Sequence, residues 1–262
     1  MSRHRFFLLS ELPVEAGGDA ILLPLSPSDL HHAVSVLRIR EGEEIDLVAP
    51  SGRVWRVAVA SASQDGLAGR VAGELVDPVA SDAPQVTLAF GVSKGARNDD
   101  IVEGAVEVGV AGLLPVLTAR SIVRFDAEKR VERGERWRRV ALAAAKQSKR
   151  LSVPEVGAPV AFSDALPVLS GYDLVLVAWE EAAASGTGIR EAIAAAGPLP
   201  PKARVAVVVG PEGGLGVEEV TLLEGIGAVV VTLGTTILRV ETAAVVATAL
   251  VLHELGGLGN AR

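Results

Sequence analysis

The pattern of the chain changes near residues 77–84, and this change constrains the fold more than any other feature. Upstream, short alternating segments such as residues 44–48 and 54–59 lie between turn-forming residues, which is typical of a small β-structure. One helix is expected there, over residues 29–37, after a Ser-Pro-Ser sequence. Downstream, apolar strands alternate with helices, which predicts an α/β fold with a mostly parallel sheet.

The segment 77–84 is polar and contains two prolines, so we interpret it as a linker. We predict an N-terminal β-barrel domain over residues 1–76 and an α/β domain over residues 85–262. The expected strands of the second domain are 86–92, 113–117, 174–178, 205–209 and 229–233. We expect four helices in this domain. The first is capped by Asn98 and ends at Gly109, the second covers residues 137–151, the third begins near Val217, and the fourth begins after residue 239.

Composition excludes several classes of function. The chain has no cysteine, so it forms no disulfide, thiolate metal site or cysteine nucleophile, and its four histidines give no pattern for a metal site. No apolar run reaches the roughly 18 residues of a membrane-spanning helix. The N-terminal residues carry no signal-peptide cleavage pattern, so we expect a cytoplasmic protein without a membrane partner.

Charge is distributed unevenly along the chain. The formal net charge is −7, which argues against binding nucleic acid through a generally basic surface. Residues 120–150, however, contain eleven basic and four acidic side chains. A basic island on an acidic protein fits one localised polyanion site. A solvated helix face with ion pairs between successive turns is the alternative interpretation.

Three expected strands are followed by segments that carry chemistry. These segments are Trp-Glu-Glu at 179–181, Gly-Pro-Glu-Gly-Gly at 210–214, and Leu-Gly-Thr-Thr-Ile-Leu-Arg-Val-Glu-Thr-Ala at 233–243. Ligands in open α/β sheets bind at the carboxyl ends of strands, and glycines let the backbone approach a ligand closely. Taken alone, each segment is equally consistent with a tight turn that has no binding role. Together they predict a backbone-lined pocket for a small ligand with a purine-like face.

The second and third segments, with their flanks at 207–220 and 233–244, resemble the ribosomal RNA small subunit methyltransferase E family. Residues 31–47, 94–110 and 136–156 also resemble it, in the family's order. The resemblance implies a PUA-like RNA-binding barrel followed by a SPOUT domain with a deep trefoil knot. It implies methylation of uridine N3 in 16S rRNA, S-adenosylmethionine as cofactor, and a homodimer whose substrate is the rRNA within the 30S subunit.

The resemblance also implies roles for individual residues. We predict that Arg239 stabilises the developing uracil anion, since a guanidinium donates hydrogen bonds without losing its charge. Glu241 is the second predicted catalytic residue, as a partner of Arg239, a cofactor contact or a base. The predicted cofactor-binding residues are Glu180, Gly210, Glu212, Gly213, Gly214, Leu233, Gly234, Ile237, Leu238, Thr242 and Ala243. The predicted RNA-binding residues are Arg38, Lys94, Arg97, Arg120, Arg124, Arg136, Arg139 and Arg150.

Alternative interpretations stay open at this point. An ion pair of Arg239 with Glu241 or Glu212 is the structural alternative to its catalytic role. The chain also departs from the family's usual pattern at Gly104, Lys146 and Val240. Another SPOUT RNA methyltransferase, acting on a ribose 2′-hydroxyl or on tRNA, is the main alternative enzyme. A non-catalytic RNA-binding assembly factor is the alternative outside enzymes, and the missing Gly-x-Gly-x-x-Gly argues against a dehydrogenase.

Overall fold

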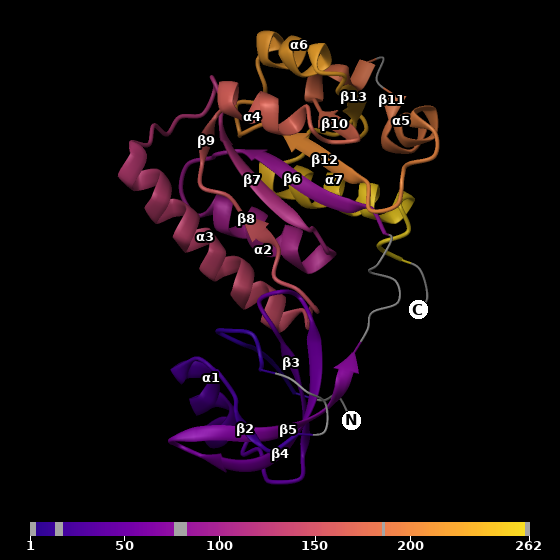
Figure 1. Cartoon of the computed structure of the whole chain (residues 1–262). Helices are drawn as coiled ribbons and strands as arrows, with labels where there is room; N and C mark the ends of the chain where they lie inside the picture. Colours follow the sequence, from indigo (N-terminus) through magenta and orange to yellow (C-terminus); the bar gives the residue numbers. More distant parts are fainter. Residues whose placement is uncertain (1–3, 14–17, 76–82, 185–186, 260–262) are drawn as a thin grey trace. The chain divides into compact units, whose positions relative to one another are not determined.

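The structure is a computed structural model that describes residues 4–13, 18–75, 83–184 and 187–259 (Figure 1). The chain divides into two compact units. The first consists of Met1–Pro78 with Ala145–Val153, and the second of Val79–Ala144 with Pro154–Arg262. The sequence did not predict that residues 145–153 belong to the first unit. Most of the expected linker, residues 77–82, lies outside the described residues.

The first unit contains a five-stranded sheet with the strand order β1-β3-β4-β5-β2. Its strands are β1 (Arg5–Phe7), β2 (Ile21–Leu22), β3 (Glu44–Val48), β4 (Val54–Ser63) and β5 (Gly66–Leu75). β1 runs parallel to β3, and the other pairings are antiparallel. Leu8 and Leu25, which follow the two edge strands, form an antiparallel bridge. Buried Ile45, Leu47 and Trp55 lie in the hydrophobic core of this unit.

The expected helix of this unit begins two residues earlier than predicted. α1 (Pro27–His31) continues into a π-helical turn, η1 (His32–Val36). Ser26 caps α1, because its hydroxyl oxygen accepts a hydrogen bond from the amide of Asp29 at 3.1 Å. The Lys146 Nζ donates to both Asp29 carboxylate oxygens, at 2.7 and 2.8 Å. A charged partner therefore accounts for the unusual lysine at position 146.

The second unit contains an eight-stranded sheet in which every strand pairing is parallel, with β9 beside β7. Its order along the path is β11-β13-β10-β12-β6-β7-β8. The strands are β6 (Gln85–Gly91), β7 (Gly112–Leu117), β8 (Glu155–Val156), β9 (Val160–Ala161), β10 (Leu174–Ala178), β11 (Thr187–Gly188), β12 (Arg204–Val209) and β13 (Val229–Thr232). The prediction of a mostly parallel α/β sheet is confirmed. β13, β10, β12 and β6 are consecutive neighbours in the sheet and run in the same direction. Their carboxyl ends therefore lie at one edge of the sheet.

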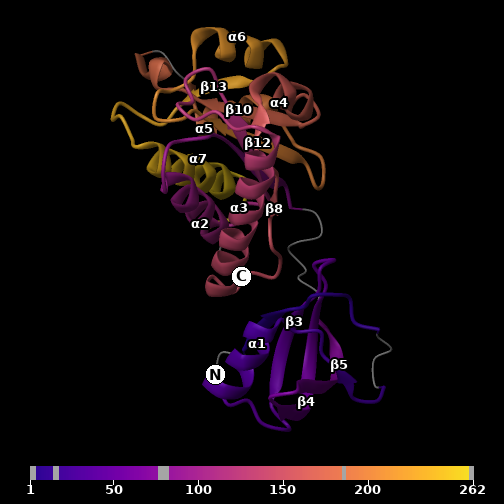
Figure 2. The same ribbon diagram turned by 90° about the vertical axis from the view of Figure 1, so that its left-hand side faces the viewer.

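Helices cover both faces of this sheet (Figures 1 and 2). α2 (Arg97–Val108) and α7 (Val240–Glu254) lie side by side on one face, and α5 (Ile189–Ala196) contacts α7. α4 (Phe162–Leu169) and α6 (Val217–Gly225) pack on the other face, over Val175, Val177 and Val208. A Cβ on Gly104 would lie 2.6 Å from Val245 Cγ2, so glycine here permits the close approach of α2 to α7.

Two helix boundaries differ from the prediction. Ala96, not Asn98, is the N-cap of α2, and the side chain of Asn98 contacts the preceding loop instead. α3 (Ala127–Gln147) begins ten residues before the predicted start, because Asp126 Oδ1 accepts a hydrogen bond from the Lys129 amide at 2.8 Å. The first turns of α3 are highly charged, so apolar periodicity gave no signal for them. The helix ends before Lys149, whose φ is 56°.

Candidate functional site

A cavity of about 480 Å³ lies at the carboxyl ends of β10, β12 and β13, within the second unit. Its wall is made from the three segments that the sequence singled out, after each of these strands. The volume is in the range of about 300–1,000 Å³ that is usual for small-molecule sites. The expectation that these segments meet at one pocket is therefore met by the geometry.

Close backbone packing shapes the glycine-rich segment. Gly214 has φ +72°, and a Cβ on it would collide with the carboxylate of Glu180. A Cβ on Gly210 would lie 2.8 Å from the backbone of Gly214 and Leu215. Glycine is required at both positions, because the turn folds back on itself against the segment that follows β10. That segment begins at Trp179 and continues as η2 (Glu180–Ala184), and Trp179 Nε1 donates to the Leu215 carbonyl.

Most predicted pocket residues line the cavity. They are Glu180, Gly210, Glu212, Gly214, Leu233, Gly234, Ile237, Leu238, Arg239, Glu241 and Ala243. Gly213 and Thr242 do not line it: the Gly213 carbonyl accepts a hydrogen bond from Arg120 Nη1 at 3.1 Å, and Thr242 is exposed on the first turn of α7. The sequence missed further wall residues, namely Arg97, Ala178, Trp179, Val209, Pro211, Thr232, Thr235, Thr236 and Val240.

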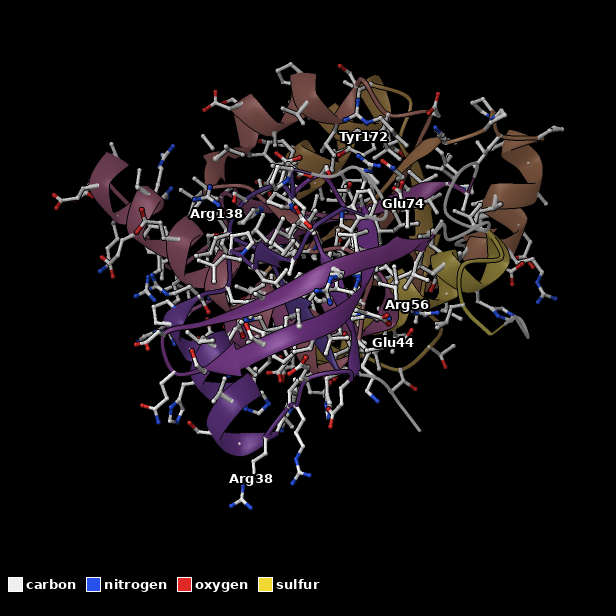
Figure 3. All side chains as sticks on the ribbon, turned by 60° about the horizontal axis from the view of Figure 1, so that its bottom comes forward. Arg38, Glu44, Arg56, Glu74, Arg138 and Tyr172 are labelled. Atoms are coloured by element: carbon white, nitrogen blue, oxygen red, sulfur yellow. The ribbon has the colours of Figure 1, made fainter. Side chains whose placement is uncertain are left out.

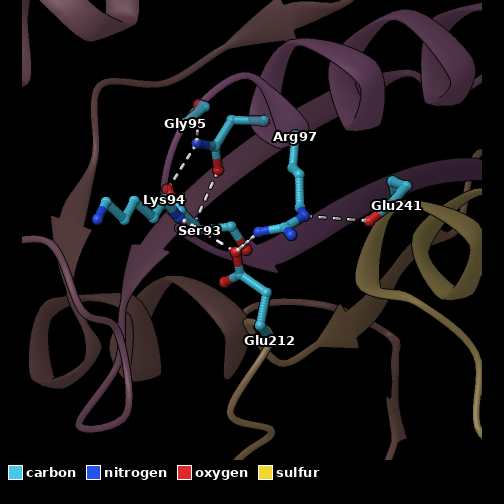
Figure 4. A network of polar contacts seen from close by, with 7 residues as sticks. Ser93, Lys94, Gly95, Arg97, Glu212 and Glu241 are labelled. Atoms are coloured by element: carbon cyan, nitrogen blue, oxygen red, sulfur yellow. Dashed lines mark hydrogen bonds and ion pairs between the residues drawn. The ribbon is translucent and has the colours of Figure 1, made fainter.

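Arg97 joins two acidic residues of the pocket (Figure 4). Its Nη1 donates to Glu212 Oε1 at 2.5 Å, and its Nε lies 4.0 Å from Glu241 Oε2. Glu212 follows β12 and Glu241 lies in the first turn of α7, so one guanidinium from α2 contacts both segments. Glu241 Oε2 is buried and has no hydrogen-bond partner. Sequence analysis predicted Arg97 as an RNA contact, and the structure places it on the cavity wall.

The surroundings of Glu212 favour its ionised form. Burial raises the pKa of its carboxyl, but Ser93, the Glu212 backbone, the Arg97 guanidinium and the Lys94 amide together lower that pKa below its ordinary value. The Lys94 amide lies 3.3 Å from Glu212 Oε1. Glu212 is therefore an anion at neutral pH, and with Glu180 and Glu241 it gives the cavity an acidic wall.

Arg239, the predicted catalytic residue, is the N-cap of α7 and lines the cavity with an exposed side chain. Its guanidinium forms no ion pair with Glu212 or Glu241, which are both described residues. Those carboxylates face Arg97 instead. The structural alternative to a catalytic role, an ion pair that occupies Arg239, is thus not what the structure contains. Val240, next to it, is buried, which suits an apolar residue at this position.

The remaining predicted RNA contacts lie in different settings. Lys94, Arg124 and Arg139 are exposed, and Arg38 extends into solvent with a left-handed φ of 55° (Figure 3). Arg136 of α3 is paired with Asp99 of α2 at 2.5 Å, which is a contact between two helices and not a pair between successive turns of one helix.

Arg150 belongs to the first unit and is only partly accessible. Burial lowers the pKa of its guanidinium to about 10. Burial opposes charge on an arginine, so this side chain is the least suited of the predicted set to a solvent-facing phosphate contact. Phosphate contacts form from exposed cations that can reach the nucleic-acid backbone.

The part of the chain that the structure describes offers neither a metal site nor a membrane-spanning helix. Among those residues, no group of three or more His, Asp or Glu side chains is arranged to hold a metal ion. None of the described helices combines the length and apolar character needed to span a bilayer.

Comparisons with known proteins identify related sequences and a related fold. The family model of an RNA methyltransferase domain matches residues 81–252, and that of an RNA methyltransferase PUA domain matches residues 25–71. Ribosomal RNA small subunit methyltransferase E of Bacillus subtilis is 31% identical over 95% of this chain and 96% of its own length. The Mycobacterium bovis protein of the same name is 38% identical over 82% of this chain and 80% of its own length.

A solved structure gives the same assignment. Ribosomal RNA small subunit methyltransferase E from Neisseria gonorrhoeae, bound to S-adenosyl methionine, is 27% identical and covers 96% of this chain and 98% of its own. It superposes with a TM-score of 0.77, which reflects the same fold. The match to the PUA model and the parallel sheet agree with the predicted α/β fold and PUA-like domain, and the trefoil knot stays a prediction. The chain therefore belongs to the ribosomal RNA small subunit methyltransferase E family.

Proposed function

We propose that this protein transfers a methyl group from S-adenosylmethionine to N3 of a uridine in 16S rRNA of the small ribosomal subunit. The observation that carries the proposal is the 480 Å³ cavity, whose wall combines the glycine-rich turn with Arg239 and Glu241. Family membership supports the reaction class, and the Neisseria relative is bound to S-adenosyl methionine. The proposal also includes the SPOUT trefoil knot and a homodimer, both implied by the sequence resemblance.

The residues of the cavity fit the cofactor chemically. S-adenosylmethionine carries a sulfonium and an ammonium, and three carboxylates line this cavity, at Glu180, Glu212 and Glu241. Glu241 Oε2 lies 4.0 Å from Arg97 Nε but accepts no hydrogen bond, so it can still accept one from an N–H group of the cofactor. The tight turn at Gly210 and Gly214 leaves backbone groups, rather than side chains, to meet the adenine. When bound, the cofactor supplies an electrophilic methyl group.

The chain's own residues then have two tasks at the acceptor base. Uracil N3 must lose its proton before it can attack, which leaves negative charge on the ring. Arg239 stabilises that charge, because its guanidinium is exposed at the cavity and is not neutralised by Glu212 or Glu241. Glu241 orients the reacting groups or accepts the proton. A cysteine-free chain cannot form the covalent adduct that methylation of uracil C5 commonly uses, so a nitrogen or oxygen acceptor is favoured.

Recognition of the RNA is assigned to the PUA-like barrel and to the basic side chains. Arg38 in the barrel and Lys94, Arg120, Arg124 and Arg139 in the second unit are exposed cations of the predicted set that lie outside the acidic wall. Arg136 is also exposed, but it is paired with Asp99. They would contact phosphates, which position RNA without reading its sequence. We propose the 30S subunit as the substrate, because the relatives' names refer to the small subunit.

The test is methyl transfer from labelled S-adenosylmethionine to 30S subunits that lack their own modification, followed by nucleoside analysis. N3-methyluridine that disappears with Arg239→Ala supports the proposal. A 2′-O-methylated product, or transfer to tRNA alone, would assign the chain to another SPOUT activity. Cofactor binding without transfer to either RNA would favour the non-catalytic assembly factor. Arg190→Ala is the matched control, because it removes an exposed arginine of the same unit that pairs with Glu254.

A further inference from the structure

Arg97 occupies a position at which three separate parts of the second unit meet. It is the first residue of α2, Glu212 lies in the turn after β12, and Glu241 lies in the first turn of α7. The two carboxylates come from the two sequence motifs that line the cavity. Among the described residues, no backbone hydrogen bond joins those two motifs directly, so the guanidinium is the polar group that links them.

The start of α2 is itself held in place. Asn98 is buried, its Oδ1 accepts from the Ser93 amide, and its Nδ2 donates to the Ser93 carbonyl, both at 2.8 Å. This fixes the loop whose Lys94 amide also approaches Glu212 Oε1. Arg97 therefore extends from a rigid base toward Glu212 and Glu241, and its side chain is half exposed. Figure 4 shows it between the two carboxylates.

We propose that Arg97 is a positioning residue of the cofactor pocket, which holds Glu212 and Glu241 in place on the cavity wall, and that it is not a contact for RNA phosphate. The identity of the ligand rests on the proposed function, but the holding role does not.

The chemistry of the side chain supports this assignment. A guanidinium offers five N–H donors in a planar fork, so it can face two carboxylates at once, whereas an ammonium acts as a point charge. Two carboxylates around one cation leave a net negative charge, which repels a phosphate. Separating Arg97 from Glu212 to bind RNA would also give up a charge-assisted hydrogen bond of 2.5 Å.

Amide hydrogen exchange without ligand tests the holding role directly. Arg97→Gln should speed exchange in the 209–214 turn and at the start of α7, because both lose their link to α2. Arg97→Lys should recover part of the protection, since it keeps the charge but satisfies one carboxylate. Arg190→Gln removes another arginine–glutamate pair of this unit, Arg190 with Glu254, and should leave both segments unchanged.

Two binding measurements separate the pocket role from RNA binding. Titration calorimetry with S-adenosylmethionine should show binding about tenfold weaker in Arg97→Gln and intermediate in Arg97→Lys, equivalent to about 1.4 kcal/mol for the first. With deproteinised 16S rRNA, Arg124→Gln should reduce the salt dependence of binding by about one counterion, and Arg97→Gln should not.

The outcomes are distinct for each claim. Unchanged exchange in Arg97→Gln, or a loss of salt dependence equal to that of Arg124→Gln, would overturn the inference. Faster exchange in the two segments supports it even if the unmodified protein binds no S-adenosylmethionine. A failure of the unmodified protein to bind S-adenosylmethionine would instead overturn the proposed function. It would leave Arg97 as the residue that orders an acidic pocket for another ligand.

Discussion

The carboxamide of Asn98 and the backbone of Ser93 form a reciprocal pair of hydrogen bonds. The Ser93 amide donates to Asn98 Oδ1 and Asn98 Nδ2 donates to the Ser93 carbonyl, each at 2.8 Å, and Asn98 is only 4% exposed. The pair connects the loop after β6 to the first turn of α2. A residue type expected to cap the helix thus fixes the loop that approaches Glu212.

Asn98→Ala should therefore destabilise the protein by about 2–3 kcal/mol, because it leaves a buried amide and a buried carbonyl of Ser93 without partners. Asn98→Asp should also be damaging, since its carboxylate keeps one acceptor but places a negative oxygen against the Ser93 carbonyl. Urea unfolding followed by circular dichroism measures both. Asp100→Ala, at an exposed position on the same turn, is the control. A loss below about 0.5 kcal/mol for Asn98→Ala would contradict this account.

Glu219 makes a second connection, between the loop after β7 and the turn that precedes α6. It is 6% exposed, and its two carboxylate oxygens accept hydrogen bonds from the amides of Ala119 at 2.8 Å and Gly216 at 2.9 Å. Glu219→Ala should cost about 2–4 kcal/mol, as two amides lose their acceptor. Glu219→Gln should cost less, since one carbonyl oxygen remains. Glu218→Gln, on the exposed neighbour, should be neutral in the same unfolding assay, and equal losses in all three variants would refute the argument.

The sequence was sufficient to predict that three motif segments form one pocket. Each of them follows an apolar strand, and parallel strands place such segments at one edge of a sheet. The order of strands was not available in the same way. β6 and β12 are neighbours in the sheet although more than 100 residues separate them in the chain. The loop after β6 therefore meets the glycine-rich turn, and Arg97 was predicted to bind RNA instead of lining the cavity.

Other misses have a similar cause. Gly104 looks unfavourable in a helix, where glycine costs about 1 kcal/mol relative to alanine, until Val245 of α7 is placed against it. Lys146 has no local partner in sequence, and Asp29 lies over 100 positions away. Both contacts depend on which distant elements pack together, and periodicity within one segment carries no such information.

Gly214 offers a test of the pocket that is independent of the charged residues. Gly214→Ala should weaken S-adenosylmethionine binding at least tenfold, because φ at this position is +72° and a Cβ would displace the Glu180 carboxylate from the cavity wall. Gly225→Ala is the matched control: its Cβ would meet no atom within 4 Å, and it lies at the end of α6. Calorimetry on folded protein distinguishes lost binding from lost structure. Full affinity in Gly214→Ala would exclude this turn from the site.

Arg239 should affect catalysis without affecting stability. Its side chain is exposed. Within the described residues, it forms no ion pair with Glu212 or Glu241, which face Arg97 instead. Arg239→Gln should lower kcat by about 10²–10³-fold, as expected when one stabilising donor for a developing anion is removed. The unfolding midpoint and the affinity for S-adenosylmethionine should stay close to those of the unmodified protein. Arg239→Lys should retain more activity, and a drop in affinity without a drop in kcat would assign Arg239 to cofactor binding instead.

The Arg97–Glu212 pair should also make stability depend on pH in a defined direction. Burial raises the pKa of Glu212, but Ser93, its own backbone, Arg97 and the Lys94 amide hold it below the ordinary value of 4.5. A carboxyl whose folded pKa is depressed contributes stability that is present above its unfolded pKa and lost as pH falls through the folded value.

The difference in unfolding free energy between the unmodified protein and Arg97→Gln should therefore be largest near pH 7 and shrink below about pH 4.5. Urea titrations from pH 7 to 3.5 measure it. Glu241 also faces Arg97, with its Oε2 4.0 Å from Arg97 Nε. In a Glu212→Gln background the effect of Arg97→Gln should vary much less with pH. A difference that grows toward acidic pH would show that Arg97 stabilises the fold through contacts other than these two carboxylates.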